Sequence, residues 1–364
     1  MNSSPFMPPS RRRSREAARR RRRRRRRLLG GTAILPLILA AAVILMLTRP
    51  WSTHTAAAAS HSRPHPKATQ ATSHRTERLS ATGLPLGRAP LPLNLSDPRA
   101  DPLHLGFHEP PSAGLVIDLS SGRVLWQRNA LTRLRIASLT KMMTALLTVK
   151  SSPPDAPVLI TKQAEETSGS KVGVLPLGHH VRLETLLYGL LLPSGNDAAV
   201  ALAQHVAGTE HRFVKDMNAE AAHLGLGCTR YSSPSGYYNT HNYSCAADLA
   251  ELASIDIRQP RIAQVTRTYT AILPFPIKGG KLYLYNNNPL LIYGYPGVTG
   301  MKTGETIEAG RCLVATAERH GVRLAVVLLH SPAPGTQARD LLDDAFRNVY
   351  HQRPVPEPAM PADA

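Results

Sequence analysis

Apolar and polar positions divide the chain into segments of different character. Residues 28–47 form an apolar run of twenty positions without a charged side chain. A helix of that length spans roughly 30 Å, the thickness of the hydrocarbon core of a membrane. Residues 48–112 show no periodicity, and ten of these 65 positions are proline, which predicts an extended linker. Regular hydrophobic patterning occupies residues 113–350, and residues 351–364 form a second proline-rich tail.

The patterned part predicts strands at both ends and helices between them. Apolar runs at Leu115–Asp118 and Arg123–Gln127 flank a Ser-Ser-Gly turn and predict a β-hairpin. Cys312–Ala317 and Val322–Leu329, joined through His-Gly, predict a second hairpin. Helical spacing of apolar residues predicts helices at Ile136–Val149, Leu183–Leu191, Asp197–Ala207, Glu210–Leu224 and Gln337–Tyr350. This order predicts an α+β fold, in which helices cover a mainly antiparallel sheet beside a helical subdomain.

Charge is concentrated at the start of the chain. Residues 1–27 hold thirteen Arg and one Glu, which is +12 of the net charge of +19. The positive-inside rule places this tail in the cytoplasm, makes residues 28–47 a single transmembrane anchor, and puts the rest outside. A cleaved signal peptide with a site near Ala56–Ala58 and a twin-arginine signal at Arg12-Arg13 remain alternatives. Because the excess charge belongs to a tail, no nucleic-acid partner is expected.

The first candidate motif is Ser138-Leu139-Thr140-Lys141. Spacing of i to i+3 at a predicted helix start places the Lys141 amine beside the Ser138 hydroxyl. A hydroxyl needs a base to become a nucleophile, and a lysine serves as one only when burial or a nearby cation lowers its pKa. The apolar neighbours favour burial. The same spacing also occurs at Ser168 and Lys171, without a helix signal, so this motif alone is weak.

Two further motifs follow in the chain. Ser194-Gly195-Asn196 lies between two predicted helices, where Ser and Asn could simply be helix caps. Lys302-Thr303-Gly304 lies on a predicted strand, where a cation and a hydroxyl could hold a substrate carboxylate. Glycine there leaves room for a peptide along the strand edge. Ser-x-x-Lys, Ser-x-Asn and Lys-Thr-Gly in this order are typical of penicillin-interacting serine enzymes.

With these motifs, residues 112–350 resemble the D-alanyl-D-alanine carboxypeptidases of serine peptidase family S11, the low-molecular-mass penicillin-binding proteins. The resemblance implies the β-lactamase/penicillin-binding-protein fold and a serine-type hydrolase without metal or organic cofactor. It implies a peptidoglycan stem peptide ending in D-Ala-D-Ala as substrate and β-lactams as inhibitors. We expect a monomer in the cell membrane with its catalytic domain on the extracytoplasmic side.

The resemblance also implies residue roles. Ser138 attacks the carbonyl of the penultimate D-alanine, Lys141 takes its proton, and Ser194 relays a proton to the departing D-alanine. Backbone N–H groups of Ser138 and Glu305 form the oxyanion hole. Substrate binding is assigned to Asn196, Lys302, Thr303, Gly304 and Glu305.

Two departures from the family pattern leave alternatives open. Glu305 follows Lys-Thr-Gly where His, Tyr or Phe is expected, and a carboxylate beside a carboxylate-binding site is unfavourable. Ser233–Tyr237 replaces a segment that usually reads like Asn-Pro-x-Gly-Leu. A DD-endopeptidase or a weakly active penicillin-binding scaffold therefore remains possible. A β-lactamase is less favoured, because no Glu-x-x-Leu-Asn segment is present.

Three cysteines remain after export, so at least one is unpaired. Cys228 and Cys245 flank a loop, and the sequence leaves open whether they form a disulfide. Cys312 lies in a predicted core strand and is expected to be a buried apolar residue. The pair His179-His180 lacks metal-ligand spacing and is expected to lie in a solvated loop.

Overall fold

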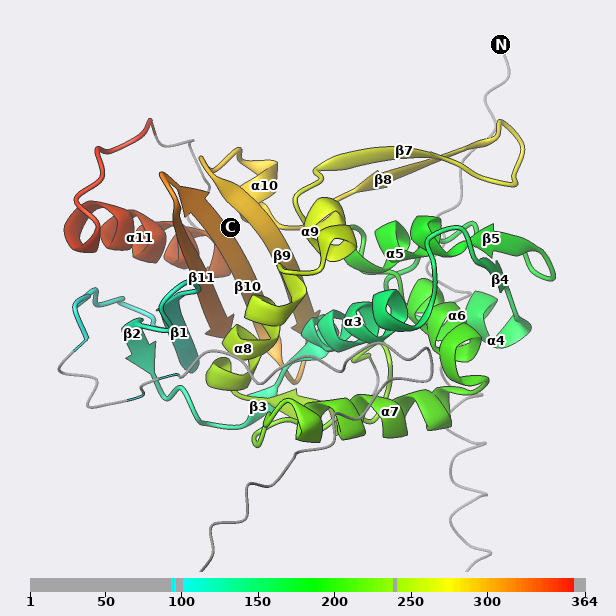
Figure 1. Cartoon of the computed structure of the whole chain (residues 1–364), viewed down its shortest axis with the longest axis horizontal. Helices are drawn as coiled ribbons and strands as arrows, with labels where there is room; N and C mark the ends of the chain where they lie inside the picture. The colour runs from blue at the N-terminus through cyan, green and yellow to red at the C-terminus, as the bar shows by residue number, and fades with distance from the viewer. Residues whose placement is uncertain (1–92, 94, 96–100, 238–240, 357–364) are drawn as a thin grey trace, which may run out of the picture. The chain divides into compact units, whose positions relative to one another are not determined.

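Five antiparallel strands form the central sheet, in the order β2-β1-β11-β10-β9 (Figure 1). The computed structural model describes residues 93, 95, 101–237 and 241–356. The strands are β1 (Ala113–Asp118), β2 (Val124–Arg128), β9 (Val298–Thr306), β10 (Gly310–Arg319) and β11 (Val322–Leu329). Both predicted hairpins are confirmed as β1–β2 and β10–β11.

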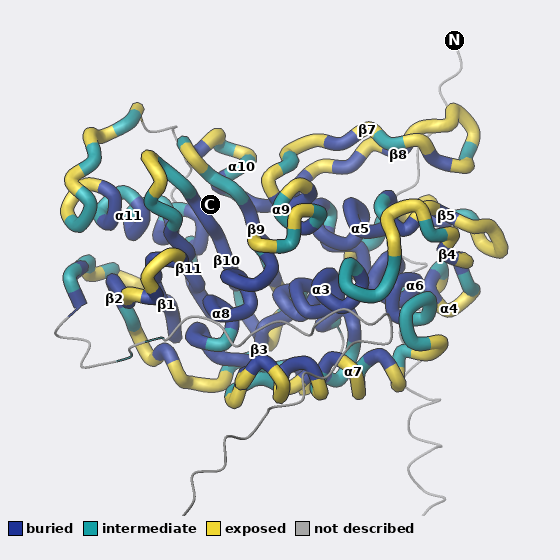
Figure 2. Tube along the Cα trace, in the orientation of Figure 1, coloured by how far each residue is buried: buried dark blue, intermediate teal, exposed yellow. Residues whose placement is uncertain are grey.

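The inner strands of the sheet are buried on both faces, which explains why β1, β10 and β11 contain nearly continuous apolar runs. In β1, Leu115 and Ile117 belong to the larger hydrophobic core, whereas Val116 belongs to the second. Successive strand residues point to opposite faces, so an apolar residue is needed at every position. Helix α8 (Ala246–Asp256) packs on the first face and α11 (Pro334–Asp344) on the second (Figure 2).

The turn of the β10–β11 hairpin shows how a local signal sets the register. His320 and Gly321 have φ angles of 47° and 79°. Two consecutive positive φ values define the type I′ turn that matches the twist of paired strands, and Gly adopts it without steric cost. Arg319 therefore pairs with Val322, and the apolar residues of both strands fall into register.

The helical subdomain lies beside the sheet and shares its larger core. Its predicted helices are confirmed as α3, α5, α6 and α7, with small differences at their ends. The remaining elements are short pairs of strands and connecting helices. The bounds are α3 (Lys141–Ser151), α4 (Lys162–Glu165), α5 (Leu183–Leu191), α6 (Asn196–Ala207), α7 (Glu210–His223), α9 (Pro260–Thr266), α10 (Pro289–Ile292), β3 (Leu134–Arg135), β4 (Pro157–Leu159), β5 (His180–Arg182), β6 (Tyr243–Ser244), β7 (Thr270–Pro274) and β8 (Lys281–Tyr285).

Two predicted helices differ from the observed ones. The helix predicted at Ile136–Val149 begins instead as a 3₁₀ turn, Ala137–Thr140, and becomes α-helical only at Lys141. Ala137 has a φ of 46°, which a right-handed helix excludes, so the α-helix cannot extend back through this residue to Ile136. At the C-terminal end, α11 starts at Pro334 and closes in a π-helical turn, Ala345–Val349.

The predicted anchor, residues 28–47, lies outside the described residues, as do the arginine-rich tail and most of the linker. Within the ranges that are described, no helix combines the length and the apolar character needed to cross a bilayer.

Candidate active site

Lys141 and Ser138 meet at the junction of the 3₁₀ turn and α3. The Nζ of Lys141 lies 2.9 Å from the Ser138 hydroxyl oxygen and donates to Asn196 Oδ1 at 2.7 Å and to the Ser235 carbonyl at 2.9 Å. The Lys141 side chain has no exposed surface. Burial and the nearby Lys302 cation lower the pKa of Lys141 well below its ordinary value, and Asp197 partly opposes them. Its pKa shift thus favours the neutral amine, which a base requires.

Asn196 is held by a segment in which sequence reasoning found no role. The Asn196 side-chain amide donates to the Ser168 carbonyl at 2.8 Å, and its backbone N–H donates to the Ser170 carbonyl at 2.7 Å. Asp197 fixes the same segment, because its carboxylate accepts the N–H groups of Val172 and Gly173. The second Ser-x-x-Lys segment, Ser168–Lys171, therefore supports the site. It does so through the backbone carbonyls of Ser168 and Ser170 and not through the Lys171 side chain.

The segment around Ser235 supports Lys141 from the other side. The Pro234 carbonyl accepts the Thr144 hydroxyl at 2.7 Å, directly before the Ser235 carbonyl that accepts Lys141. Gly236 follows with a φ of 78°, and a Cβ there would lie 2.0 Å from the Ala137 carbonyl oxygen. The departure from the family segment at this place therefore retains the glycine that the close approach requires.

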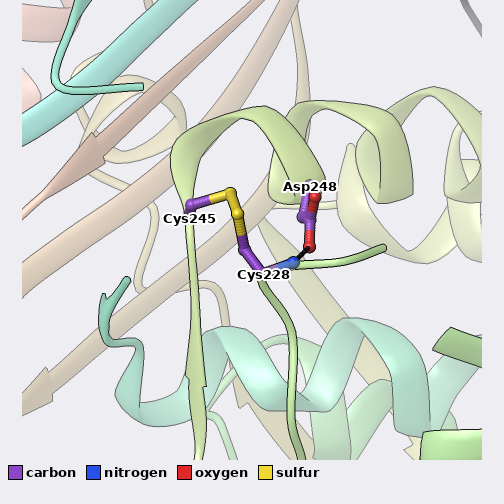
Figure 3. Close-up of side chains that lie close together, drawn as sticks. All are labelled: Cys228, Cys245 and Asp248. Carbon is purple, nitrogen blue, oxygen red and sulfur yellow. Dashed lines mark hydrogen bonds between the residues drawn. A yellow bond between two sulfur atoms is a disulfide. The ribbon is translucent and has the colours of Figure 1, made fainter. Parts of the chain in front are cut away.

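A disulfide joins Cys228 to Cys245 and closes the stretch of chain that carries Pro234 and Ser235 (Figure 3). This resolves the pairing that the sequence left open. The carboxylate of Asp248 accepts the Cys228 N–H at 2.8 Å and the Thr229 hydroxyl at 2.6 Å. Cys312 is a free thiol and is buried, as predicted.

Ser138 opens into a cavity of about 360 Å³ between β9 and the helical subdomain. The lining residues are Ser138, Ser170, Ser194, Asn287, Pro289, Thr303, Gly304, Glu305, Arg311, Cys312 and Pro334. Lys141, Asn196 and Lys302 are buried and do not line it. All three motifs therefore contribute to this cavity. The hydroxyl residues Ser138, Ser194 and Thr303 line it, and the amines of Lys141 and Lys302 are buried beneath the lining.

Gly304 sets the distance between β9 and the turn that carries Ser138. A Cβ at Gly304 would lie 2.8 Å from the Ile136 carbonyl oxygen and 3.1 Å from the Ser138 nitrogen. Both distances are shorter than ordinary van der Waals contact, so a side chain here would push the strand and the turn apart. The glycine of the third motif thus acts through packing against the first motif.

Lys302 lies two residues before Gly304 on β9, and its side chain is buried. Its Nζ donates to the Thr303 carbonyl at 2.9 Å. Burial lowers the pKa of Lys302 to about 7. An anion entering the cavity would favour the charged form of this lysine.

Ser194 adopts the left-handed backbone conformation, with a φ of 64°. Its hydroxyl is buried in the cavity lining and has no hydrogen-bond partner within the described residues. The helix-cap alternative is wrong for this motif, because α6 is capped by Gly195 without a side-chain hydrogen bond. A strained residue with an unsatisfied hydroxyl is typical of a functional position.

Arg311 is a cavity residue that sequence reasoning missed. It lies on β10 directly opposite Glu305 on β9. Glu305 is exposed at the cavity surface, so water screens its charge. The arginine also places a cation beside the unexpected carboxylate. Only the β9–β10 register reveals this proximity, and the sequence does not supply that register.

Because Arg311 and solvent already weaken the field of Glu305, its removal is expected to have a small effect. We expect Glu305→Gln to lower the KM for a substrate ending in a carboxylate by about two- to fivefold, since like charges repel. The kcat should remain within about twofold. Steady-state kinetics at low and high salt measure this, and an increase in KM would contradict the repulsion.

Comparisons with known proteins agree with these motifs. The sequence profile of peptidase family S11, D-alanyl-D-alanine carboxypeptidase, matches residues 110–333. The carboxypeptidase DacF of Bacillus subtilis is 35% identical over 256 residues, covering 68% of this chain and 64% of the relative. This chain therefore spans less than two thirds of that relative's length.

Relatives with other activities are similarly close. A D-alanyl-D-alanine endopeptidase of Pseudomonas aeruginosa is 36% identical over 221 residues, which is 59% of this chain and 70% of the relative. Among solved structures, a variant of the Streptomyces K15 DD-transpeptidase has a TM-score of 0.60 at 32% identity. That similarity covers 68% of this chain and 98% of the transpeptidase.

Proposed function

Since this chain belongs to the D-alanyl-D-alanine carboxypeptidase family, peptidase family S11, we propose that it removes the terminal D-alanine from peptidoglycan stem peptides. The observation that carries the proposal is the buried Lys141 amine, 2.9 Å from the Ser138 hydroxyl at the base of a cavity. This is the pairing of nucleophile and base that acyl transfer through serine requires.

In the acylation step, Ser138 Oγ attacks the carbonyl carbon of the penultimate D-alanine while its proton passes to Lys141 Nζ. The backbone N–H groups of Ser138 and Glu305 stabilise the developing oxyanion, an effect often worth about 10²–10³ in rate per donor. The C–N bond then breaks, and the departing D-alanine takes a proton through the Ser194 hydroxyl. Water hydrolyses the resulting ester and regenerates Ser138.

Substrate binding follows from the charges around the cavity. Lys302 and Thr303 hold the terminal carboxylate, with Lys302 charged when that anion is present. Asn196 lies behind the cavity lining, so in this geometry it acts on the substrate through Lys141, which its Oδ1 holds. Gly304 and Glu305 continue the strand edge along which the peptide lies. A β-lactam places its own carboxylate at Lys302 and acylates Ser138, and the ester then hydrolyses slowly.

We also propose that residues 28–47 anchor the protein as a single-pass segment of the cell membrane. The support is the uncharged apolar run and the arginines that precede it. The proline-rich linker would then hold residues 113–350 on the extracytoplasmic side, where peptidoglycan is found.

The proposed function is tested with the full chain in detergent. We expect fluorescent penicillin to label the protein and diacetyl-Lys-D-Ala-D-Ala to release D-alanine. Ser138→Ala should abolish both, while circular dichroism shows the wild-type fold. Labelling without D-alanine release would instead support the endopeptidase or scaffold alternative, and rapid turnover of the drug would support a lactamase.

A further inference from the structure

The β7–β8 hairpin carries a row of exposed apolar side chains. Ile272, Tyr283 and Tyr285 are 57%, 55% and 56% exposed. The opposite face of the hairpin is buried against the core through Ala271, Leu282 and Leu284. The hairpin therefore has a normal buried side, and its outward side presents tyrosines where polar residues would be expected.

Strand pairing makes these residues contiguous. Ile272 pairs directly with Tyr283, and Tyr285 follows two positions later on the same face of β8. We call Ile272, Tyr283 and Tyr285 the tyrosine strip. A contiguous exposed apolar surface of this kind marks an interaction site more often than scattered single residues do.

The strip is connected to the cavity lining through a short stretch of chain. Strand β8 ends at Tyr285 and leads directly to Asn287, which lines the cavity and whose N–H donates to the Leu192 carbonyl at 3.2 Å. Asn286 between them is buried, and its amide donates to the carbonyls of Thr266 and Thr268. The junction is therefore fixed. At about 3.3 Å per residue, Tyr285 and Tyr283 lie roughly 7 and 13 Å along the chain from Asn287.

We propose that the tyrosine strip binds the glycan strand that carries the stem peptide, an inference that rests on the proposed function. A stem peptide with its end in the cavity reaches roughly 10–16 Å before it meets its sugar, at up to about 3.6 Å per residue. The two tyrosines lie within that reach. Tyrosine presents an apolar ring and a hydroxyl, which complement the C–H face and the hydroxyls of a sugar ring.

A membrane surface is a weaker match for the strip. Basic residues that attract anionic lipid, Lys278 and Lys281, lie at the turn end of the hairpin. The tyrosines instead lie from mid-strand toward the end of β8 that leads to Asn287. A membrane-facing hairpin would combine its aromatic and basic residues at one end.

The test compares a polymer with a small peptide. We would measure D-alanine release by the full chain from uncrosslinked peptidoglycan with pentapeptide stems and from diacetyl-Lys-D-Ala-D-Ala. For the double variant Tyr283→Ser/Tyr285→Ser, we expect the KM on the polymer to rise tenfold or more. Release from the small peptide and penicillin labelling should stay within twofold. Leu131→Ser, which removes an equally exposed residue after β2, serves as control.

Co-sedimentation with the same polymer measures binding without relying on activity. The double variant should lose most of the bound fraction, and Tyr283→Phe/Tyr285→Phe should restore part of it through the ring. If Tyr283→Ser/Tyr285→Ser behaved like the wild type in both assays, the inference would be overturned while the proposed function stayed intact. Loss of binding to anionic phosphatidylglycerol vesicles with unchanged polymer binding would also overturn it and identify a membrane surface. Absence of D-alanine release by the wild type would count against the proposed function alone.

Discussion

Replacing Lys141 by methionine is expected to lower the rate of Ser138 acylation by penicillin about 10²–10⁴-fold, the usual contribution of a general base. Methionine fills much of the same buried space, but it cannot accept the serine proton. Burial of an amine with a lowered pKa opposes folding, whereas the loss of the bonds to Asn196 Oδ1 and the Ser235 carbonyl favours unfolding, so these contributions offset each other and the unfolding temperature should change little. Stopped-flow labelling and thermal unfolding measure the two effects separately.

The chain supplies its own control for this variant. Lys171 has the same spacing from Ser168, yet its Nζ donates to the Glu165 carbonyl. Lys171→Met should therefore keep its acylation rate within about threefold of the wild type. Acylation of the Lys141 variant at the wild-type rate would disprove the base assignment.

The pH profile adds a readout that a purely structural role would not change. Only the neutral Lys141 amine accepts a proton, so acylation rises with pH through its pKa. The Lys302 cation helps to lower that pKa. Removing it in Lys302→Met should raise the pKa of Lys141 and move the rising limb of the acylation rate to higher pH. The position of the limb, rather than its height, is the test, because Lys302→Met also weakens carboxylate binding.

The elements that the sequence predicted are those with an unambiguous local signal. The continuous apolar strands, the Ser-Ser-Gly and His-Gly turns and the amphipathic helices all appear in the structure. Helix α8 was missed, because every residue except Asp248 is buried and no polar face marks its period. Its assignment depends on tertiary packing against the sheet, which a single sequence does not reveal.

In the candidate site, too, some contributions could be predicted from the sequence and others could not. Ser138 and Lys141 lie one helical turn apart, so the sequence alone could pair them. The carbonyls of Ser168, Ser170 and Ser235 were missed, because any residue type supplies a backbone carbonyl and no motif records it. Arg311 reaches the cavity only through the β9–β10 register. Side-chain chemistry was thus predictable, whereas the backbone frame that orients it was not.

That backbone frame leads to a second large expected effect, at Gly236. Alanine here would place a Cβ 2.0 Å from the Ala137 carbonyl oxygen and 2.7 Å from the Thr140 hydroxyl. Neither Gly236 nor the turn can move without displacing Ser138, or the Ser235 carbonyl that holds Lys141. A displacement of about 1 Å in a catalytic pair costs roughly 10²-fold. We therefore expect Gly236→Ala to lower the acylation rate by about 10²-fold or more and to lower the unfolding temperature.

Part of any such loss comes from the backbone alone, since Gly236 has a positive φ that alanine disfavours. Gly225 separates the two causes, because its φ of 74° is nearly the same and a Cβ there meets no atom within 4 Å. Gly225→Ala should show a similar conformational cost to stability, with acylation near the wild-type rate. If both variants lost stability equally and both acylated normally, the close approach of Gly236 to the nucleophile turn would not matter. A selective loss of acylation in Gly236→Ala would instead establish that the segment around Ser235 fixes the geometry of the serine–lysine pair.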